Sequence, residues 1–237
     1  YGLKNVDLLD GESVKQALLD AGIFGYINQL PYAVSTTPDT KPKAIFVSAF
    51  RDMPLASDFE VELEGNEKDF QTGLNALSKI QKTYLGISSN QTAKALVDAE
   101  NVEINIFKGK CPAGNVGVQI GKISPINAGE RVWTVTPQDV ATIGELFLTG
   151  KFNATRTVAL VGSEVKDAQY YNVISGAAIA DLVAGKIEGD NVRVISGDVL
   201  TGTKVKMDGN LGFLSNTVTI IPEGNVYRMF GWMPFAS

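Results

Sequence analysis

The stretch Lys43-Ala-Ile-Phe-Val-Ser-Ala-Phe50 is a continuous apolar run of strand length. Continuous apolar runs are typical of strands that are covered on both faces, as in a parallel sheet. A second run of this kind is Thr83-Tyr-Leu-Gly-Ile-Ser88, and a third covers residues 102–107. We therefore expect residues 43–50 to form a central strand of a parallel sheet.

Helical patterns lie between these strands. Apolar residues recur at helical spacing from Phe70 to Ile80, and residues 92–99 form a shorter helical pattern. A helix between two strands favours parallel pairing through a right-handed crossover. The alternation therefore predicts a Rossmann-like α/β layout.

Helix signals also mark both ends of this half of the chain. Residues 13–21 are apolar on one face, and Gly22 is placed to end that helix. Thr136-Pro-Gln-Asp139 is a strong helix start, because threonine can cap, proline suits the first turn and aspartate favours the positive end. We expect this second helix to end at Gly150.

Beyond Gly150 the pattern changes to short strands with one helix, at about residues 177–184. A mostly β segment with one helix is typical of a smaller α+β domain. We therefore predict a Rossmann-like α/β domain over residues 1–153 and an α+β domain over residues 154–237. The strands expected in the second domain are residues 157–161, 170–174, 192–195, 218–221 and 226–230.

Composition excludes several classes of function. With no histidine and one cysteine in 237 residues, the chain lacks Ser-His-Asp and Cys-His arrangements and any Cys-rich zinc or iron–sulfur site. We therefore expect no catalytic residues, no metal ligands and no redox cofactor. The net charge of −5 argues against nucleic acid as a partner. No apolar run approaches the roughly 18 to 20 residues of a membrane span, and the cysteine usage fits a cytoplasmic protein.

Two loops are candidates for ligand binding, because each follows the carboxyl end of a predicted parallel strand. They are Arg51-Asp-Met-Pro-Leu55 and Lys108-Gly-Lys-Cys-Pro-Ala-Gly-Asn-Val-Gly117. Open parallel sheets bind ligands at this edge, so we expect the two loops to share one locally positive crevice. The candidate crevice residues are Arg51, Asp52, Pro54, Lys108, Lys110, Pro112, Gly114 and Asn115.

Each loop also has a purely structural explanation. The spacing of Gly114, Gly117 and Gly121 fits neither the G-x-G-x-x-G pattern nor the P-loop pattern. These glycines can instead serve a tight turn and close helix packing, and Asp52 and Pro54 can simply shape a turn. The sequence leaves both interpretations open.

Phe24-Gly-Tyr-Ile-Asn-Gln-Leu-Pro-Tyr32 places three aromatic residues and a proline in a predicted loop. This composition suits contact with an apolar ring or with another protein, and core packing is the alternative. The candidate contact residues are Phe24, Tyr26, Pro31 and Tyr32.

Cys111 and the acidic stretch of residues 58–64 have mainly structural interpretations. The neighbouring lysines could favour a reactive thiolate at Cys111, but a lone cysteine is more often a small buried hydrophobic residue. Acidic and apolar residues alternate over residues 58–64, which predicts the solvated face of an edge strand. We assign no chemistry to this stretch.

Longer motifs in the first half carry a family resemblance. They are Cys111-Pro-Ala-Gly-Asn-Val-Gly-Val-Gln-Ile120, Pro125-Ile-Asn127, Val132-Trp-Thr-Val-Thr-Pro-Gln-Asp-Val140 and Ile143-Gly-Glu-Leu-Phe147. Together they resemble the A-subunit of the sodium-translocating NADH:quinone reductase.

Three motifs of the second half agree with this resemblance. They are Val192-Arg-Val-Ile-Ser-Gly-Asp-Val-Leu-Thr-Gly202, Leu211-Gly-Phe213 and Phe230-Gly-Trp232. They are similar to the soluble-ligand-binding β-grasp (SLBB) domain of that family. The resemblance therefore implies an SLBB β-grasp fold for residues 154–237.

The resemblance implies a peripheral subunit on the cytoplasmic face of the bacterial inner membrane. In this family a six-subunit complex passes electrons from NADH to quinone and exports sodium, and the flavins and iron centres belong to other subunits. The resemblance thus implies that the other subunits are partners, that quinone is a substrate of the complex, and that this chain binds no redox cofactor. It also implies that the chain, which begins with Tyr1, is a piece of a longer subunit.

Two functions follow from these observations. The first is a cofactor-free subunit segment that assists quinone binding and complex assembly. The second is a flavin- or nucleotide-binding oxidoreductase domain that uses the crevice between residues 51–55 and 108–117. The fold is similar to the flavin-binding subunit of respiratory complex I, but a Gly-rich flavin loop is not found at this crevice. The related C-subunit of the Rnf complexes carries Cys-rich segments that this sequence lacks.

Overall fold

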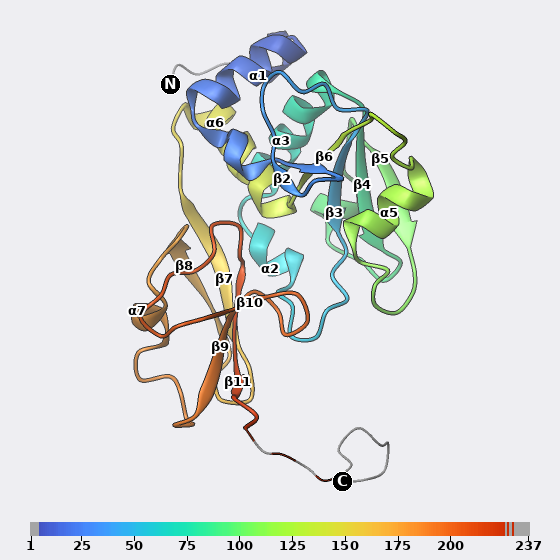
Figure 1. The fold of residues 1–237 in the computed structure, drawn as a ribbon. Helices are drawn as coiled ribbons and strands as arrows, with labels where there is room; N and C mark the ends of the chain where they lie inside the picture. Colours follow the sequence, from blue (N-terminus) through green and yellow to red (C-terminus); the bar gives the residue numbers. More distant parts are fainter. Residues whose placement is uncertain (1–4, 226, 228, 230–237) are drawn as a thin grey trace.

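The protein contains two β-sheets, and the computed structural model describes residues 5–225, 227 and 229. Helices flank the first sheet, and the second sheet lies below it in the view of Figure 1. The predicted strand over residues 226–230 falls largely outside the described residues.

Six strands form the first sheet. In chain order they are β1 (Asn28–Leu30), β2 (Val34–Ser35), β3 (Ile45–Ala49), β4 (Thr83–Ser88), β5 (Glu103–Phe107) and β6 (Val132–Val135). Their order in the sheet is β2-β1-β6-β3-β4-β5. Because β3 pairs in parallel with both β4 and β6, it is a central strand, as predicted. Sequence patterns did not predict β6 or the antiparallel hairpin of β1 and β2 at the sheet edge.

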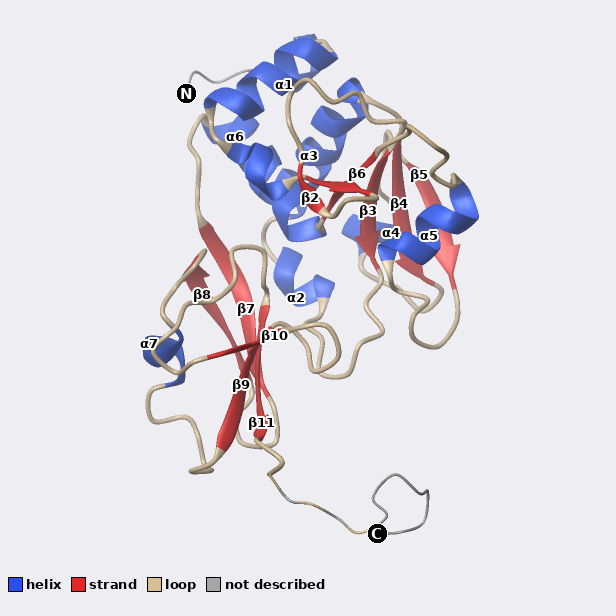
Figure 2. Ribbon diagram, in the orientation of Figure 1, coloured by secondary structure: helices blue, strands red, loops and turns tan. Residues whose placement is uncertain are grey.

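Helices cover both faces of this sheet. They are α1 (Gly11–Asp20), α2 (Phe59–Leu63), α3 (Glu67–Ile80), α4 (Lys94–Val97), α5 (Val116–Ile123) and α6 (Pro137–Thr149), with the 3-10 turns η1 (Val6–Leu8) and η2 (Ile23–Tyr26). In Figure 2, α1, α3 and α6 stack together, whereas α5 lies across β3 and β4. Side chains of a strand alternate between faces. Accordingly, Ile45 and Val47 pack in the core that includes α3 and α6, and Phe46 packs with Ile120 of α5.

Local signals set the ends of two helices as predicted. The Thr136 side chain caps α6 by accepting a hydrogen bond of 3.3 Å from the Asp139 backbone N–H. Gly150 ends α6 with a φ of 69°, and Gly22 follows α1 with a φ of 73°. Both glycines therefore adopt the left-handed conformation that favours glycine at the end of a helix.

The two longest helices, α3 and α6, cross at a pair of glycines. A Cβ atom on Gly144 of α6 would overlap the backbone carbonyl of Asp69, and one on Gly73 of α3 would overlap that of Val140. Backbone therefore packs on backbone at the crossing. Gly144 is buried on α6 because of this crossing.

In the described part of the second half there are five strands and a short helix. They are β7 (Thr155–Val161), β8 (Gln169–Ile174), β9 (Val192–Ser196), β10 (Thr203–Val205), β11 (Thr217–Pro222) and α7 (Ile179–Val183). The sheet order is β10-β9-β11-β7-β8, with β11 parallel to β7. Leu182 and Val183 of α7 pack in a separate core with Leu160, Val218 and Ile220. The predicted fold class, a parallel α/β sheet followed by a smaller α+β sheet, is confirmed.

The acidic stretch of residues 58–64 is helical, so the predicted edge strand is wrong. Asp58 caps α2 by accepting a hydrogen bond of 2.9 Å from the Glu60 backbone N–H. Phe59 and Leu63, four residues apart, are both buried, whereas Val61 is exposed. Burial here follows the helical period rather than the alternation of acidic and apolar residues.

Replacing Gly144 with alanine tests the close helix crossing. We expect Gly144→Ala to lower the free energy of unfolding by about 3 kcal/mol, because the added methyl group forces α3 and α6 apart. Urea unfolding followed by tryptophan fluorescence measures the change. The control is Gly121→Ala in α5, where nothing lies within 4 Å of an added Cβ atom. This control should stabilise the chain by about 0.5–1 kcal/mol, and equal effects of the two substitutions would contradict the crossing.

Candidate functional site

The two loops predicted to share a crevice are in direct contact. The Gly114 backbone N–H donates a hydrogen bond of 2.9 Å to Asp52 Oδ2, and Ser48 Oγ donates to the Gly114 carbonyl over 3.3 Å. A Cβ atom on Gly114 would lie 2.6 Å from the Phe50 carbonyl oxygen. Gly114 thus allows the second loop to lie against the end of β3, as the structural explanation of these glycines expects.

The amino-terminal end of α5 is capped by the chain itself. Asn115 accepts a hydrogen bond of 2.7 Å from the Gly117 backbone N–H, next to the Asp52 contact with Gly114. Backbone N–H groups at such a position would otherwise be free to bind an anion. Pro54, Lys108, Lys110 and Pro112, the other predicted crevice residues, are exposed along the two loops.

Cys111 is exposed, so the interpretation of this residue as a small buried hydrophobic side chain is wrong. It lies in the turn before α5, and its Sγ atom is 3.6 Å from Sδ of Met53. The physical reason for its exposure is that this turn packs through its glycine backbone at Gly114 rather than through side chains.

Arg51 turns away from the second loop and binds the acidic helix α2. Its guanidinium group pairs with Glu62, donates to the Ser57 carbonyl over 3.1 Å, and lies 3.8 Å from the centroid of the Phe59 ring. The Glu62 side chain is completely buried, and Ser57 Oγ also donates to it. Glu62 is therefore a structural anion rather than part of a solvated face.

Sequence reasoning missed Glu62, although a signal was present. On a helix that buries Phe59 and Leu63, Glu62 occupies a neighbouring position of the same face. A carboxylate on a buried face requires a cation, and Arg51 is the nearest arginine in the sequence.

A second buried ion pair lies between the two halves of the chain. Arg156 of β7 approaches Asp139 of α6, with Nη2 and Oδ1 3.4 Å apart, and both side chains are almost completely buried. Thr136 Oγ1 donates a hydrogen bond of 2.6 Å to the other carboxylate oxygen of Asp139. Burial raises the pKa of Asp139, and the Arg156 guanidinium opposes this shift.

Hydrogen bonds extend this junction between the two sheets. The Asp58 backbone N–H donates to Tyr170 Oη over 2.9 Å, and Gln138 Nε2 donates to the Thr157 carbonyl over 3.3 Å. Within the second half, Arg156 Nη1 also donates to the Phe213 carbonyl over 3.0 Å, which orients the guanidinium group. The pair of Asp139 and Arg156 and the two bonds that cross the junction join the second sheet to the first, beside the carboxyl ends of the first-sheet strands (Figure 1).

The four predicted contact residues of the aromatic loop fall into two groups. Phe24 is buried and packs edge-on against Trp133, with ring centroids 5.9 Å apart. Tyr26 is buried at the junction, 4.6 Å from the ring centroid of Phe213. Core packing therefore accounts for these two rings. Pro31 and Tyr32 are exposed at the β1–β2 hairpin.

The described residues contain no group of three or more His, Cys, Asp or Glu side chains that could hold a metal ion. Among the helices of the described part, none is both long and apolar enough to span a bilayer.

This architecture defines a class of protein. In this class a Rossmann-like α/β domain is joined through a buried polar junction to a small β domain. Residues 9–152 match the family described as the NqrA second alpha/beta domain, and residues 157–207 match the one described as the NQRA C-terminal domain, an SLBB domain. The chain belongs to the NqrA family, which confirms the resemblance seen in its sequence motifs.

Curated relatives are named as the A-subunit of Na(+)-translocating NADH-quinone reductase. The protein of Neisseria meningitidis serogroup B is 35% identical over 95% of this chain and 51% of its own length. That of Shewanella frigidimarina is 34% identical over 98% of this chain and 52% of its own length. The chain therefore spans about half the length of the curated relatives that it matches.

Solved structures share the fold at low identity. A crystal structure of NAD+-reducing NiFe-hydrogenase in the H2-reduced state matches with a TM-score of 0.59 and 13% identity, covering 92% of this chain and 50% of the other. The air-oxidised form matches with a TM-score of 0.58 and 15% identity. At such identities the likeness shows the fold alone.

Removing the cation of the first buried pair tests how the carboxyl edge of the first sheet is held. We expect Arg51→Ala to lower the free energy of unfolding by about 3–5 kcal/mol, because Glu62 is then buried without a cation. Lys108→Ala, an exposed cation of the neighbouring loop, should change it by no more than about 0.5 kcal/mol. Chemical denaturation of both variants makes the comparison. Equal stability of the two variants would show that the buried pair does not hold this edge together.

Proposed function

We propose that this chain is a cofactor-free segment of the NqrA subunit in a sodium-translocating NADH:quinone reductase, where it assists quinone binding and complex assembly. Membership of the NqrA family and the names of the relatives support this proposal. The chain spans about half the length of each of these relatives.

The observation that carries the cofactor-free assignment is the hydrogen bond from the Gly114 N–H to Asp52. Flavin and nicotinamide nucleotides bring phosphate groups, which α/β folds hold on backbone N–H groups at this edge. Here a carboxylate of the chain uses that donor and adds a negative charge, which repels a phosphate. Arg51 cannot compensate, because its guanidinium group binds Glu62.

Quinone contact is assigned to the β1–β2 hairpin. Tyr32 is 63% exposed, follows the exposed Pro31, and has the Arg131 guanidinium 5.3 Å from its ring centroid. A quinone ring carries little charge, so an exposed aromatic ring and a proline suit it better than a cluster of cations. The same residues suit contact with another subunit of the complex, so their exposure supports either kind of contact at this hairpin.

The cellular placement follows from the same proposal. The segment belongs to a peripheral part of the complex on the cytoplasmic face of the inner membrane. Its net charge of −5 suits contact with protein subunits rather than with the anionic lipid surface.

Ligand titration separates this function from the flavin- or nucleotide-binding alternative. We expect a short-chain quinone to shift the NMR signals of Pro31 and Tyr32, and Tyr32→Ala to abolish these shifts. FMN and NADH should leave residues 51–55 and 108–117 unchanged, both in the chain and in a Lys110→Ala control. Shifts in these loops with FMN or NADH that Lys110→Ala weakens would instead support the oxidoreductase alternative.

Isolation of the complete NqrA protein from native membranes tests assembly. We expect NADH-driven, sodium-stimulated quinone reduction to accompany an affinity-tagged full-length protein through purification. Measuring this activity in the eluate, with an untagged strain as control, decides the outcome. Recovery of the tagged protein alone, while the activity stays in the unbound fraction, would contradict the assignment to the complex.

A further inference from the structure

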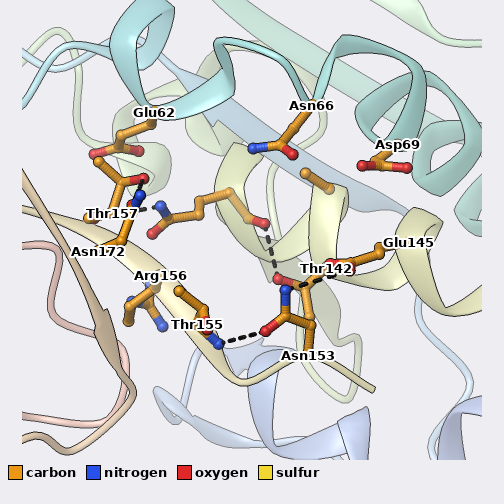
Figure 3. Close-up of a pocket in the computed structure, with 12 residues that line it drawn as sticks. Glu62, Asn66, Asp69, Thr142, Glu145, Asn153, Thr155, Arg156, Thr157 and Asn172 are labelled. Carbon is orange, nitrogen blue, oxygen red and sulfur yellow. Dashed lines mark hydrogen bonds between the residues drawn. The ribbon is translucent and has the colours of Figure 1, made fainter. Parts of the chain in front are cut away.

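A polar cavity of about 200 Å³ lies at the junction between the two sheets. Its walls come from α2 and α3, from α6, and from β7 and β8, and they carry carboxylate, amide and hydroxyl groups. Figure 3 shows Glu62 on one side of the cavity and Asp69 and Glu145 on the other. Neither predicted candidate site includes this cavity.

Two buried oxygen atoms of the cavity wall lack a hydrogen-bond donor. Glu62 Oε2 and Gln138 Oε1 have no partner among the residues that the structure describes. Glu62 is 1% exposed and Gln138 6% exposed, so bulk water does not compensate for the missing bonds. A buried acceptor without a donor costs about 1–3 kcal/mol, so the wall favours an occupant that donates hydrogen bonds.

The charges around the cavity also favour an occupant that carries positive charge. The two arginines nearby are committed, since Arg51 pairs with Glu62 and Arg156 pairs with Asp139. Asp69 and Glu145 add two further carboxylates, and Glu145 accepts only a neutral donor, Asn153 Nδ2, over 3.2 Å. Arg156 Nε is a buried donor of the same wall without an acceptor among the described residues, so the wall holds two free acceptor oxygens, one free donor and an excess of negative charge.

The pKa of Asp69 reflects this excess of negative charge. Burial and then the charge of Glu145 raise the pKa of Asp69, and only the charge of Lys68 opposes the shift. The ionised form of Asp69 is therefore less favourable in the folded chain than in the unfolded chain. Unfavourable charge of this kind is typical of binding sites rather than of packing.

We propose that this cavity binds a small organic cation that carries primary ammonium groups, and that the cation bridges the two sheets. Ammonium groups supply both the positive charge and the several N–H donors that the wall lacks. A metal ion is a poorer match, because the described residues hold no cluster of three or more ligand side chains. The bound cation contacts α3 and α6 on one side and β7 on the other.

The probe is 1,3-diaminopropane, which carries two ammonium groups at pH 7, compared with tetramethylammonium at the same ionic strength. Tetramethylammonium is a cation without N–H donors, so it reports screening alone. Binding is followed on the full chain through the NMR signals of Asn153, Thr155 and Asn172, which line the cavity. We expect saturable shifts with the diamine and none with tetramethylammonium. Equal shifts with both cations would overturn the proposal.

Two substitutions at the partly exposed rim locate the binding site. Asp69→Asn and Glu145→Gln should each weaken diamine binding about tenfold, because each removes one carboxylate from the cavity. Glu64→Gln, at an exposed carboxylate that does not line the cavity, is the matched control and should leave the affinity unchanged. Unchanged affinity in both rim variants would overturn the proposal.

A second readout separates binding from a structural role. Asp69→Asn should raise the urea midpoint of the free chain at pH 7, since it removes a charge that the folded state holds at a cost. This gain should vanish once the pH falls below the ordinary pKa of an aspartate, where Asp69 is neutral in both states. Greater stability together with weaker diamine binding supports a ligand site. A loss of both would show that Asp69 merely holds the fold together, and would overturn the proposal.

Discussion

The buried pair of Arg51 and Glu62 is the interaction on which the carboxyl edge of the first sheet, where the two halves meet, depends. Arg51 begins the loop that follows β3, the central strand, so the pair ties α2 directly to the carboxyl end of the sheet. Ser57 joins the same cluster and lies 3.5 Å from Thr217 of β11 through its hydroxyl group. Removing one partner of such a pair leaves an uncompensated buried charge, which is why the edge tolerates little change.

This cluster also affects whether the carboxyl edge of the first sheet can bind a ligand. In open parallel sheets the carboxyl edge is where loops leave room for a ligand. Here Arg51 is used for an internal pair, Asp52 accepts a hydrogen bond from Gly114, and the second sheet lies alongside. The Gly114 backbone N–H and Arg51, two of the groups that could hold an anionic cofactor, are thus engaged within the chain. The proposed cofactor-free role follows from this occupation of the edge.

Much of the fold could be predicted from sequence because its signals are local. The apolar run of β3 and the cap at Thr136 depend on a few neighbouring residues, and both predictions were confirmed. The strand predicted over residues 58–64 was wrong. Acidic and apolar residues alternate there, but the contact of Arg51 with the Phe59 ring favours a helix. The ion pair of Asp139 and Arg156 could not be predicted from the sequence, because these two residues meet only through tertiary packing.

We infer that the chain's own side chains occupy the ligand edge of the first sheet and keep an anionic cofactor from it. A crystal structure of the chain grown with FMN and NADH at high concentration tests it most directly. We expect Asp52 to remain on the Gly114 backbone N–H and Arg51 to remain on Glu62, with no cofactor between residues 51–55 and 108–117. A cofactor phosphate bound at the Gly114 N–H, with Asp52 displaced, would contradict it.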